Sequence, residues 1–530
     1  MFSTPKENQL SSGNPTIDSL YHNVEWLITA FAGTLVFIIF VMQVYRIPTG
    51  SMAETLRGAH FRIRCGQCGY QYDHDFVAGN YGMANTANPS KKMPIMHPDP
   101  SQPGTFSSSR CPSCGHFEPP LYLDNAKRLY SVQNNRARQP FMRTVFKGDQ
   151  IFVLKSVYQF FQPKRWDVIV FKNPTEPNIN YIKRCVGLPG EELVIMDGDI
   201  FVNGQIQRKP EKVQEELWMI IYNNDYQPVQ PNERTFNGHA WKQPFENIES
   251  SEWNLSEEPT VFSLNASDGR LHRIQYNDDQ GNDFRATYGY DNPMTYPQMP
   301  ICSDLMVQYY VTMEGPSTAG AQIRKYGTTY QGQVSSDGTM ELFRLASDGQ
   351  PVSLTQKQCD FKDVNRLSRF RFATLDRQLV LEYGAAKLVY DLNSEIDASD
   401  ANRQIVPQVQ ILGAGQLKLS HAALYRDIHY LSGQDTDAVL RASQDAPMHL
   451  GENEYFACGD NSPYSADSRM WNKDGLANNG KSYPAGVVPK DYLVGKAFVV
   501  HWPGGYRLKQ EPIRWIPFPD GMKIIYGGGK

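Results

Sequence analysis

The chain lacks a strong net charge. Its 52 Lys and Arg residues nearly balance 56 Asp and Glu residues, which gives a formal net charge of -4. It also lacks a basic block, so the composition excludes a nucleic-acid partner held through its phosphates. Internal repeats and low-complexity tracts are absent as well. At 530 residues, with 40% apolar residues and 12% aromatic residues, the chain predicts two to four packed domains.

Charged side chains are missing from one long stretch, residues 26–45. About 20 helical residues cross the roughly 30 Å hydrocarbon layer of a bilayer, and Trp26 and Tyr45 occupy the ends, where interfacial aromatic residues belong. A cleaved secretory signal has a shorter apolar part of about 7–15 residues behind positive charge. A buried core helix is the other alternative. The sequence predicts a polar tail, residues 1–25, and a transmembrane helix, residues 26–45, with a lipid bilayer as partner.

Histidine is absent from the three segments that indicate catalysis. These are residues 47–52 with Ser51, residues 181–190 with Lys183, and residues 459–469. A serine hydroxyl is a weak nucleophile until a neighbouring base takes its proton. Lysine serves as that base when burial lowers its pKa from about 10.4 towards neutrality. Lys183 lies in a run of β-forming residues and can point into an apolar pocket, so the sequence predicts a Ser51–Lys183 dyad.

These segments resemble the sequence boxes of bacterial type I signal peptidases, membrane-bound Ser/Lys proteases that remove signal peptides. Four boxes match in order: residues 48–52, residues 147–149 with 165–171, residues 181–190, and residues 459–469. One box alone would be weak evidence, whereas four behind an apolar helix are specific. The resemblance covers under half of the chain. Two positions depart from the family pattern, because Glu54 replaces a usual proline and Trp166 replaces a usual glycine.

The resemblance implies a role for each matched residue. Ser51 would attack the scissile carbonyl, and Lys183 would be the general base. The Ser51 backbone N–H and the Thr49 hydroxyl would form the oxyanion hole. The other residues would support these groups: Met52 beside the nucleophile, Ser465 on Lys183, and Asp460, Asp467 and Arg469 in the loop that carries Ser465.

The resemblance also implies the substrate and the location. Substrates would be the signal peptides of exported preproteins, and the catalytic domain would lie outside the cytoplasm on a single-pass anchor in the cell membrane. Loop charge suggests the opposite orientation, since four arginines follow the apolar run: Arg46, Arg57, Arg62 and Arg64. Large folded domains can override loop charge, so we expect the orientation of the family. The alternative function is a non-enzymatic, membrane-anchored binding protein that uses a β-sandwich insert, residues 211–450, with carbohydrate as a candidate ligand.

Cysteine is scarce, with 8 residues, but four cysteines form two Cys-x-x-Cys pairs: Cys65 with Cys68, and Cys111 with Cys114. A glycine follows each pair, as in zinc ribbons, and four thiolates suit a tetrahedral zinc ion. The interval between the pairs is longer than a usual ribbon loop. Disulfide pairing outside the cytoplasm is the alternative. The sequence predicts a zinc-ribbon-like insert, residues 65–120, with a structural zinc ion and no cofactor for catalysis.

Short β-forming runs between Gly, Pro and Asp predict a mainly β fold. A catalytic β-domain of the signal-peptidase type is expected in three parts, residues 46–64, 121–210 and 451–530. Residues 211–450 contain regularly spaced runs without helical periodicity, which predicts an inserted antiparallel β-sandwich. This insert faintly resembles concanavalin-like jelly rolls, which often bind carbohydrate. Core packing explains its aromatic residues better than sugar stacking does.

Overall fold

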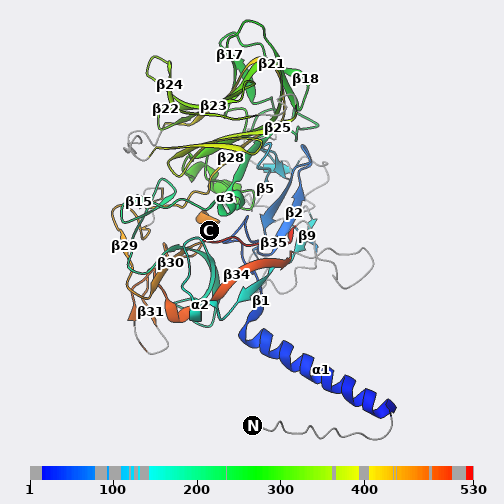
Figure 1. Ribbon diagram of the computed structural model, residues 1–530, viewed down its shortest axis with the longest axis vertical. Helices are drawn as coiled ribbons and strands as arrows, with labels where there is room; N and C mark the ends of the chain where they lie inside the picture. The colour runs from blue at the N-terminus through cyan, green and yellow to red at the C-terminus, as the bar shows by residue number, and fades with distance from the viewer. Residues whose placement is uncertain are drawn as a thin grey trace, which may run out of the picture.

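The computed structural model is mainly β, with one long helix. Figure 1 shows a large sheet at the top, smaller sheets below it, and helix α1 (Pro15–Phe40) leaving the lower end of the body. The structure describes residues 15–77, 92–94, 109–118, 121–123, 129–131, 142–233, 236–360, 366–392, 405–433, 435–436, 439–476, 480, 482–503 and 521–528. Of the predicted tail, residues 1–25, the first 14 residues lie outside the described residues, and the rest belongs to α1.

An eight-stranded antiparallel sheet carries Lys183. Its strands, in spatial order, are β1 (Met42–Arg46), β10 (Gln150–Leu154), β34 (Leu493–Trp502), β11 (Val168–Lys172), β12 (Asn180–Gly187), β30 (Glu454–Cys458) and β33 (Val488–Pro489), with β35 (Lys523–Ile524) paired to β34. No described residue between 211 and 450 contributes a strand to this sheet. The pairing of β12 with β30 brings together two segments that are far apart in the sequence.

A four-stranded sheet packs beside it, made of β15 (Gln205–Ile206), β14 (Asp199–Val202), β13 (Glu192–Met196) and β29 (Met448–His449). β13 and β14 form a hairpin in which Met196 pairs with Asp199. The two turn residues, Asp197 and Gly198, have φ values of 55° and 84°. An Asp-Gly pair is favoured in a two-residue turn because both positions need positive φ. Asp197 and Gly198 meet this requirement between β13 and β14.

The upper body is one hydrogen-bonded sheet of 13 antiparallel strands. They are β16 (Met219–Asn223), β17 (Phe245–Ile248), β18 (Asn254–Glu258), β19 (Val261–Asn265), β20 (His272–Tyr276), β21 (Leu305–Lys325), β22 (Thr328–Ser335), β23 (Thr339–Leu345), β24 (Pro351–Gln358), β25 (Ser368–Leu375), β26 (Gln378–Tyr383), β27 (Ala386–Asp391) and β28 (Gln408–Arg426). The long strands β21 and β28 pair along most of their length, with two shifts in register. All parts of the sheet enclose one apolar core. The predicted jelly-roll sandwich stays a prediction.

The insert region, residues 211–450, packs against the strands on either side of it in the sequence. Helix α3 (Glu211–Leu217) and residues 428–450 bury apolar side chains in a core shared with β12 and β13. Ile428, Tyr430 and Met448 belong to this core, together with Val186 and Leu193. Residues at both ends of the predicted 211–450 segment therefore pack with the catalytic strands.

The cysteine-containing region is built from short strands. β2 (His60–Arg64), β3 (Gln71–Asp75), β9 (Met142–Phe146) and β4 (Lys92–Pro94) form one sheet, and β5 (Ser109–Arg110) pairs with β6 (Phe117–Glu118). The remaining described elements are β7 (Leu121–Leu123), β8 (Leu129–Ser131), β31 (Gly475–Leu476), β32 (Ser482–Tyr483), α2 (Val157–Phe160) and three short 3-10 helices (Pro293–Gln298, Ser462–Tyr464 and Lys490–Tyr492).

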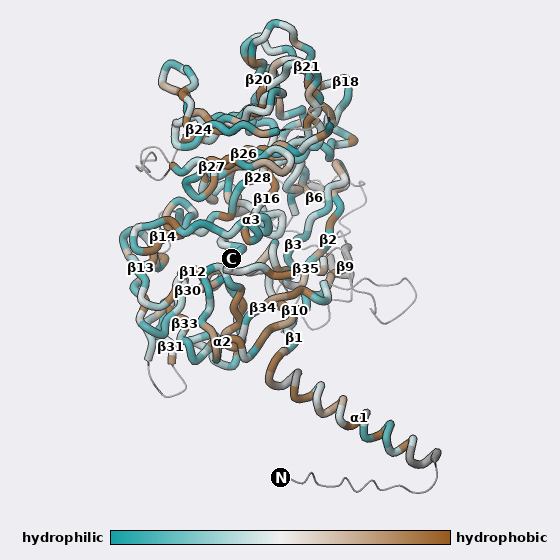
Figure 2. Tube along the Cα trace, in the orientation of Figure 1, coloured by the Kyte–Doolittle hydropathy of each residue, from teal (hydrophilic) through white to brown (hydrophobic). Residues whose placement is uncertain are grey.

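The predicted helix over residues 26–45 has the wrong boundaries. α1 begins at Pro15 and ends at Phe40, and β1 follows from Met42 because its backbone pairs with β10. Figure 2 shows that apolar residues gather in the half of α1 nearest the body. Among the helices of the described residues, none combines the length and apolar character needed to cross a membrane.

Candidate active site

The turn that holds Ser51 follows β1. The backbone N–H of Ala53 donates to the Gly50 carbonyl (2.9 Å), and that of Leu56 donates to the Met52 carbonyl (2.7 Å). Met52 is fully buried in the core that includes Ile182. The turn is thus pinned to the sheet through Met52, while Ser51 itself remains partly exposed.

Lys183 points from the middle of β12 towards this turn. Its Nζ lies 2.5 Å from the Ser51 Oγ, within hydrogen-bond distance, and the side chain is only 4% exposed. Burial lowers the pKa of Lys183 to about 8, although the carboxylates of Asp467 and Asp460 act in the opposite direction. A substantial fraction of this lysine is therefore neutral slightly above neutral pH, and a neutral amine can accept the serine proton.

The 459–469 loop lies directly against the serine. The backbone N–H of Asn461 donates to the Ser51 carbonyl (3.2 Å). A Cβ at Gly459 would overlap both the Ser51 carbonyl oxygen and the Ser465 Oγ, so only glycine permits this approach. The loop therefore holds the Ser51 carbonyl in place.

Ser465 does not make the predicted hydrogen bond to Lys183. Its hydroxyl is fully buried and faces the Asp467 carboxylate, whose pKa it helps to lower. The hydroxyl packs against Gly459 instead. Ser465 is close to the nucleophile, but the structure does not place it as the residue that orients the lysine.

Two fully buried ion pairs surround Lys183. Arg469 donates to both carboxylate oxygens of Asp467, at 2.9 and 2.7 Å. Arg184 does the same to Asp460, at 2.8 and 2.7 Å. Burial alone would raise the pKa of Asp467, but the charge of Arg469 beside it holds that pKa below its usual value. Sequence reasoning identified Asp460, Asp467 and Arg469 as supporting residues but missed Arg184. The only sign of a role for Arg184 in the sequence was its position next to Lys183.

Residues 288–291 of the insert region also reach the site, which sequence reasoning did not foresee. The Tyr288 hydroxyl donates to the Asp460 carbonyl oxygen (3.0 Å), and the Asn461 amide donates to the Asp291 carboxylate (2.7 Å). The Tyr290 ring fills the space where a Gly50 Cβ would stand. These residues form a loop without periodicity, so no pattern in the sequence pointed to them.

Access to the serine is open on one side. Thr49, the predicted oxyanion-hole residue, is exposed beside the partly exposed Ser51. A pocket of about 390 Å³ is lined in part by Glu54 and Arg57, which follow the turn. Its lining mixes aromatic and charged groups: Glu54, Arg57, Arg62, Tyr70, Gln71, Tyr72, Asp73, Pro112 and Gly521. Arg57 and Asp73 are paired across it at 2.7 Å.

The four paired cysteines converge. Cys65 and Cys114 have their Sγ atoms 3.7 Å apart, as do Cys68 and Cys111, and all four sulfurs lie within 4.8 Å of one another. All eight cysteines fall within the described residues and are free thiols. The spacing is too long for a disulfide, whose sulfurs are about 2.05 Å apart, and it fits a four-thiolate metal site.

A cluster of buried acidic residues is partly neutralised by lysine side chains. Four buried carboxylates converge where the insert region meets the catalytic strands: Asp199, Asp304, Asp376 and Asp427. Lys209 forms ion pairs with Asp376 and Asp427, and Lys325 forms one with Asp304. These ammonium groups make the cluster an electrostatic junction between the two regions.

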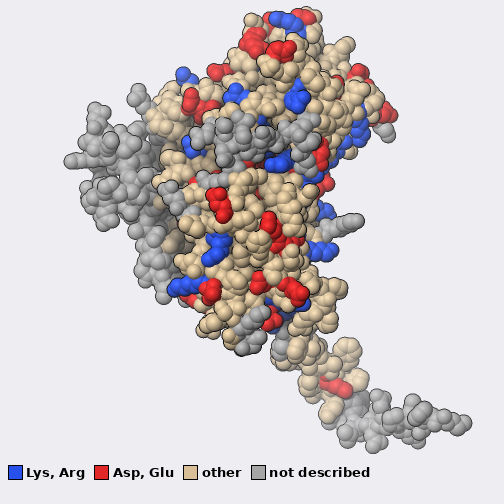
Figure 3. Space-filling model, turned by 90° about the vertical axis from the view of Figure 1, so that its left-hand side faces the viewer, with Lys and Arg blue, Asp and Glu red and all other residues tan. Residues whose placement is uncertain are grey.

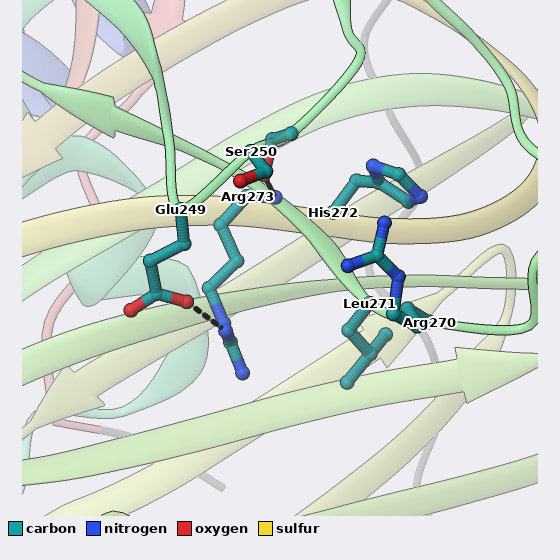
Figure 4. A pocket seen from close by; sticks show the side chains of 7 residues that line it. Glu249, Ser250, Arg270, Leu271, His272 and Arg273 are labelled. Atoms are coloured by element: carbon teal, nitrogen blue, oxygen red, sulfur yellow. Dashed lines mark hydrogen bonds and ion pairs between the residues drawn. The ribbon is translucent and has the colours of Figure 1, made fainter.

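A separate pocket of about 390 Å³ lies far along the chain, in the large sheet. Figure 4 shows Glu249 paired with Arg273 in its wall, with His272 and Arg270 on the other side. None of the predicted site residues lines it. On the face shown in Figure 3, Lys and Arg residues alternate with Asp and Glu residues without a single-sign patch.

Comparison with known proteins is consistent with this geometry. Residues 128–244 and 409–502 match the family model described as signal peptidase, peptidase S26. The match includes Lys183 and the 459–469 loop but not Ser51. Signal peptidase I of Rickettsia akari is 28% identical over 172 residues, which covers 32% of this chain and 59% of that protein. Signal peptidase I of Pseudomonas aeruginosa is 36% identical over 104 residues, or 17% of this chain and 37% of that protein.

The chain thus spans about 59% of the length of the first curated relatives that it matches. The family match and these relatives show that parts of the chain are similar to signal peptidases. Among solved structures, a galectin from Caenorhabditis elegans aligns with a TM-score of 0.19 and 12% identity, covering 24% of this chain and 87% of that chain. A likeness at that score says nothing about the function of the large sheet.

The Arg184–Asp460 pair generates the first prediction. Replacing Arg184→Met should leave the Asp460 carboxylate buried without its partner and lower the free energy of unfolding by about 3–5 kcal/mol. Denaturant titration measures the change. The matched control is Arg273→Met, which breaks an exposed pair with Glu249 and should cost about 0–1 kcal/mol. Equal losses in the two variants would contradict the importance of the buried pair.

Proposed function

We propose that the protein is a serine endopeptidase of the signal peptidase I type, which cleaves signal peptides with Ser51 as nucleophile and Lys183 as general base. The observation that carries the proposal is the 2.5 Å contact between the Lys183 Nζ and the Ser51 Oγ. The burial that lowers the pKa of Lys183 supports the same assignment. The family match and the named relatives give independent support.

The proposed reaction begins with neutral Lys183. As the Ser51 oxygen attacks the scissile carbonyl carbon, its proton passes to the lysine amine, which becomes an ammonium group. That proton then goes to the leaving amine of the cleaved peptide. In the second half, Lys183 takes a proton from water, and the resulting hydroxide attacks the ester carbonyl. Ser51 regains its proton from the lysine, and the signal peptide leaves as a carboxylate.

Charge on the carbonyl oxygen develops during both attacks. We assign its stabilisation to the Ser51 backbone N–H and the Thr49 hydroxyl, which would act as hydrogen-bond donors. The 459–469 loop lies against the same turn, because Asn461 donates to the Ser51 carbonyl. That contact holds the Ser51–Met52 peptide, whereas the Ser51 N–H belongs to the preceding peptide, where the Tyr290 ring packs against Gly50.

The non-enzymatic alternative is not favoured. A pure binding protein has no need to hold a lysine amine against a serine hydroxyl in a buried site. The cost of burying Lys183 makes such an arrangement unfavourable unless it serves a reaction. A carbohydrate ligand for the insert region has no support in the comparisons.

We also propose that the protein is held at a bilayer by α1, with the active site outside the cytoplasm. Large apolar side chains of α1 are mostly exposed: Trp26 (72%), Leu27 (72%), Phe31 (68%) and Phe40 (64%). Phe160 and Phe161 are 77% and 70% exposed beside the same end of the body, since Lys155 donates its backbone N–H to the Val41 carbonyl. Together these side chains offer apolar area that lipid can cover.

The dyad is tested by substitution. Ser51→Ala and Lys183→Ala should each reduce cleavage of a signal-peptide substrate by at least about 10³-fold, and the double variant should be no slower than either single one, because the two groups act as a unit. Circular dichroism checks that each variant is folded. The control is Lys172→Ala in the neighbouring strand β11, which should keep its activity. Substantial activity in either single variant would refute the assignment.

The pH dependence follows from the pKa of Lys183, which is about 8. The reactive form is the neutral amine, so kcat/KM should rise as pH increases through about 8 and level off above it. Well below pH 8, kcat/KM should fall about tenfold for each unit by which the pH is lowered. The substrate should carry no group that titrates between pH 6 and 9. A flat profile across this range would argue against lysine as the base.

Membrane association is tested with vesicles. Deleting residues 15–40 should remove most of the binding to lipid vesicles in a flotation assay, because α1 supplies the largest exposed apolar surface. The control variant Val439→Ser also removes an exposed apolar side chain, which is 94% exposed, and it should float as the original chain does. Undiminished flotation after the deletion would show that α1 is not the anchor.

A further inference from the structure

We propose that Cys65, Cys68, Cys111 and Cys114 bind one zinc ion, and that this ion locks the loop of residues 282–291 against the Ser51 turn. The metal site is argued from the positions of the four sulfurs. Any consequence of this lock for peptide cleavage rests on the function proposed above. The zinc ion would be a structural element of the protein that takes no part in the chemistry.

The sulfur positions fit one tetrahedral ion. Thiolates at about 2.3 Å from zinc lie about 3.8 Å apart in a tetrahedron. The closest sulfur pairs here are 3.7 Å apart, and the four sulfurs stay within 4.8 Å of one another. Cys65, Cys111 and Cys114 are buried, with at most 6% exposure, so a bound ion would be shielded from water.

The two Cys-x-x-Cys turns have the same backbone geometry. The N–H of Gly69 donates to the Cys65 carbonyl (3.0 Å), and the N–H of Gly115 donates to the Cys111 carbonyl (2.9 Å). Both glycines have φ of 76°, a conformation that other residues rarely adopt. In the first turn, the Tyr70 N–H points at the Cys68 sulfur at 3.4 Å. Such an N–H group stabilises a thiolate, and the matching backbone geometry of the two turns indicates two halves of one metal site.

The insert region forms hydrogen bonds with both Cys-x-x-Cys turns. Gln67, inside the first turn, accepts from the backbone N–H of Gln230 through its side chain (3.0 Å) and from that of Val229 through its carbonyl (3.0 Å). Beside the second turn, the Asn282 amide donates to the Pro112 carbonyl (2.7 Å), and Arg110 donates to the Asn282 side chain. The cysteine turns thus contact the insert region more closely than a free-standing ribbon would.

The same contacts continue to the nucleophile. Gly289 packs against Pro112 of the second turn. The next residue, Tyr290, receives the Asp75 N–H on its carbonyl oxygen (3.0 Å) and donates its hydroxyl to the Ala59 carbonyl (3.3 Å). Its ring lies against Gly50, the residue before Ser51. An unbroken set of contacts therefore joins the sulfurs to the serine turn.

Metal analysis of the full chain, purified under reducing conditions, tests the site without any peptidase assay. About one zinc ion per chain is expected by elemental mass spectrometry. The Cys65→Ser and Cys111→Ser variants should lose it, and the control Cys359→Ser, in a thiol distant from the cluster, should keep it. Zinc below about 0.1 per chain, or iron in its place, would overturn the assignment.

Cobalt titration of the metal-stripped chain covers the case in which the cysteine variants do not fold. A four-thiolate site should bind about one Co²⁺ with the intense visible absorption of a tetrahedral cobalt–thiolate complex, which zinc then displaces. An octahedral spectrum, or no binding, would refute the site.

Hydrogen exchange tests the link to the serine turn. Removing zinc should increase amide exchange in residues 282–291 and 50–58 at least several-fold, while β26 stays unchanged as an internal reference. Unchanged exchange in both segments would refute the lock even if zinc is bound. Because none of these measurements uses substrate, they remain decisive if the peptidase proposal fails.

Discussion

Everything in the site depends on keeping one buried lysine partly neutral. Burial pushes the pKa of Lys183 down, but the carboxylates of Asp460 and Asp467 lie close enough to pull it back up. Each carboxylate is neutralised by its own arginine, Arg184 or Arg469. The pairs let the loop stay buried and polar without forcing a proton onto the lysine. Removing either arginine would leave a buried, unpaired carboxylate charge beside Lys183.

The insert region contacts the loop and the turn on which this constraint depends. The loop that carries Asp460 is held from outside by Tyr288 and Asp291, and the serine turn is held by Tyr290. On the other side, Lys209 fixes the start of the insert region through ion pairs with Asp376 and Asp427. The large sheet thus contacts the catalytic frame both at its chain junction and at the site.

The sequence predicted local structure well where the signal was local. Short strands such as β10 and β13 agree with the mainly β fold that the β-forming runs predicted, and the Asp197-Gly198 turn follows from the need for positive φ. Ser51 and Lys183 were found because each lies in a dense motif. Tertiary contacts were missed where they join distant segments, as with Arg184 and Tyr290. The end of α1 was also missed, since residues 42–45 are apolar enough for either a helix or the edge strand that they form.

Trp166 shows that the catalytic frame and the insert region are adapted to each other. It replaces a usual glycine of the family it resembles, and its φ of 72° lies in the region that favours glycine. A bulky residue there costs on the order of 1–3 kcal/mol. The ring offsets this cost by packing in the core with Val186, and its indole N–H donates to the Arg208 carbonyl (3.2 Å). The Lys209 ammonium lies 5.7 Å from the ring. The ring therefore packs in the core that Leu217 and Ile428 of the insert region share with Val186, beside the Lys209 that pairs with the junction carboxylates.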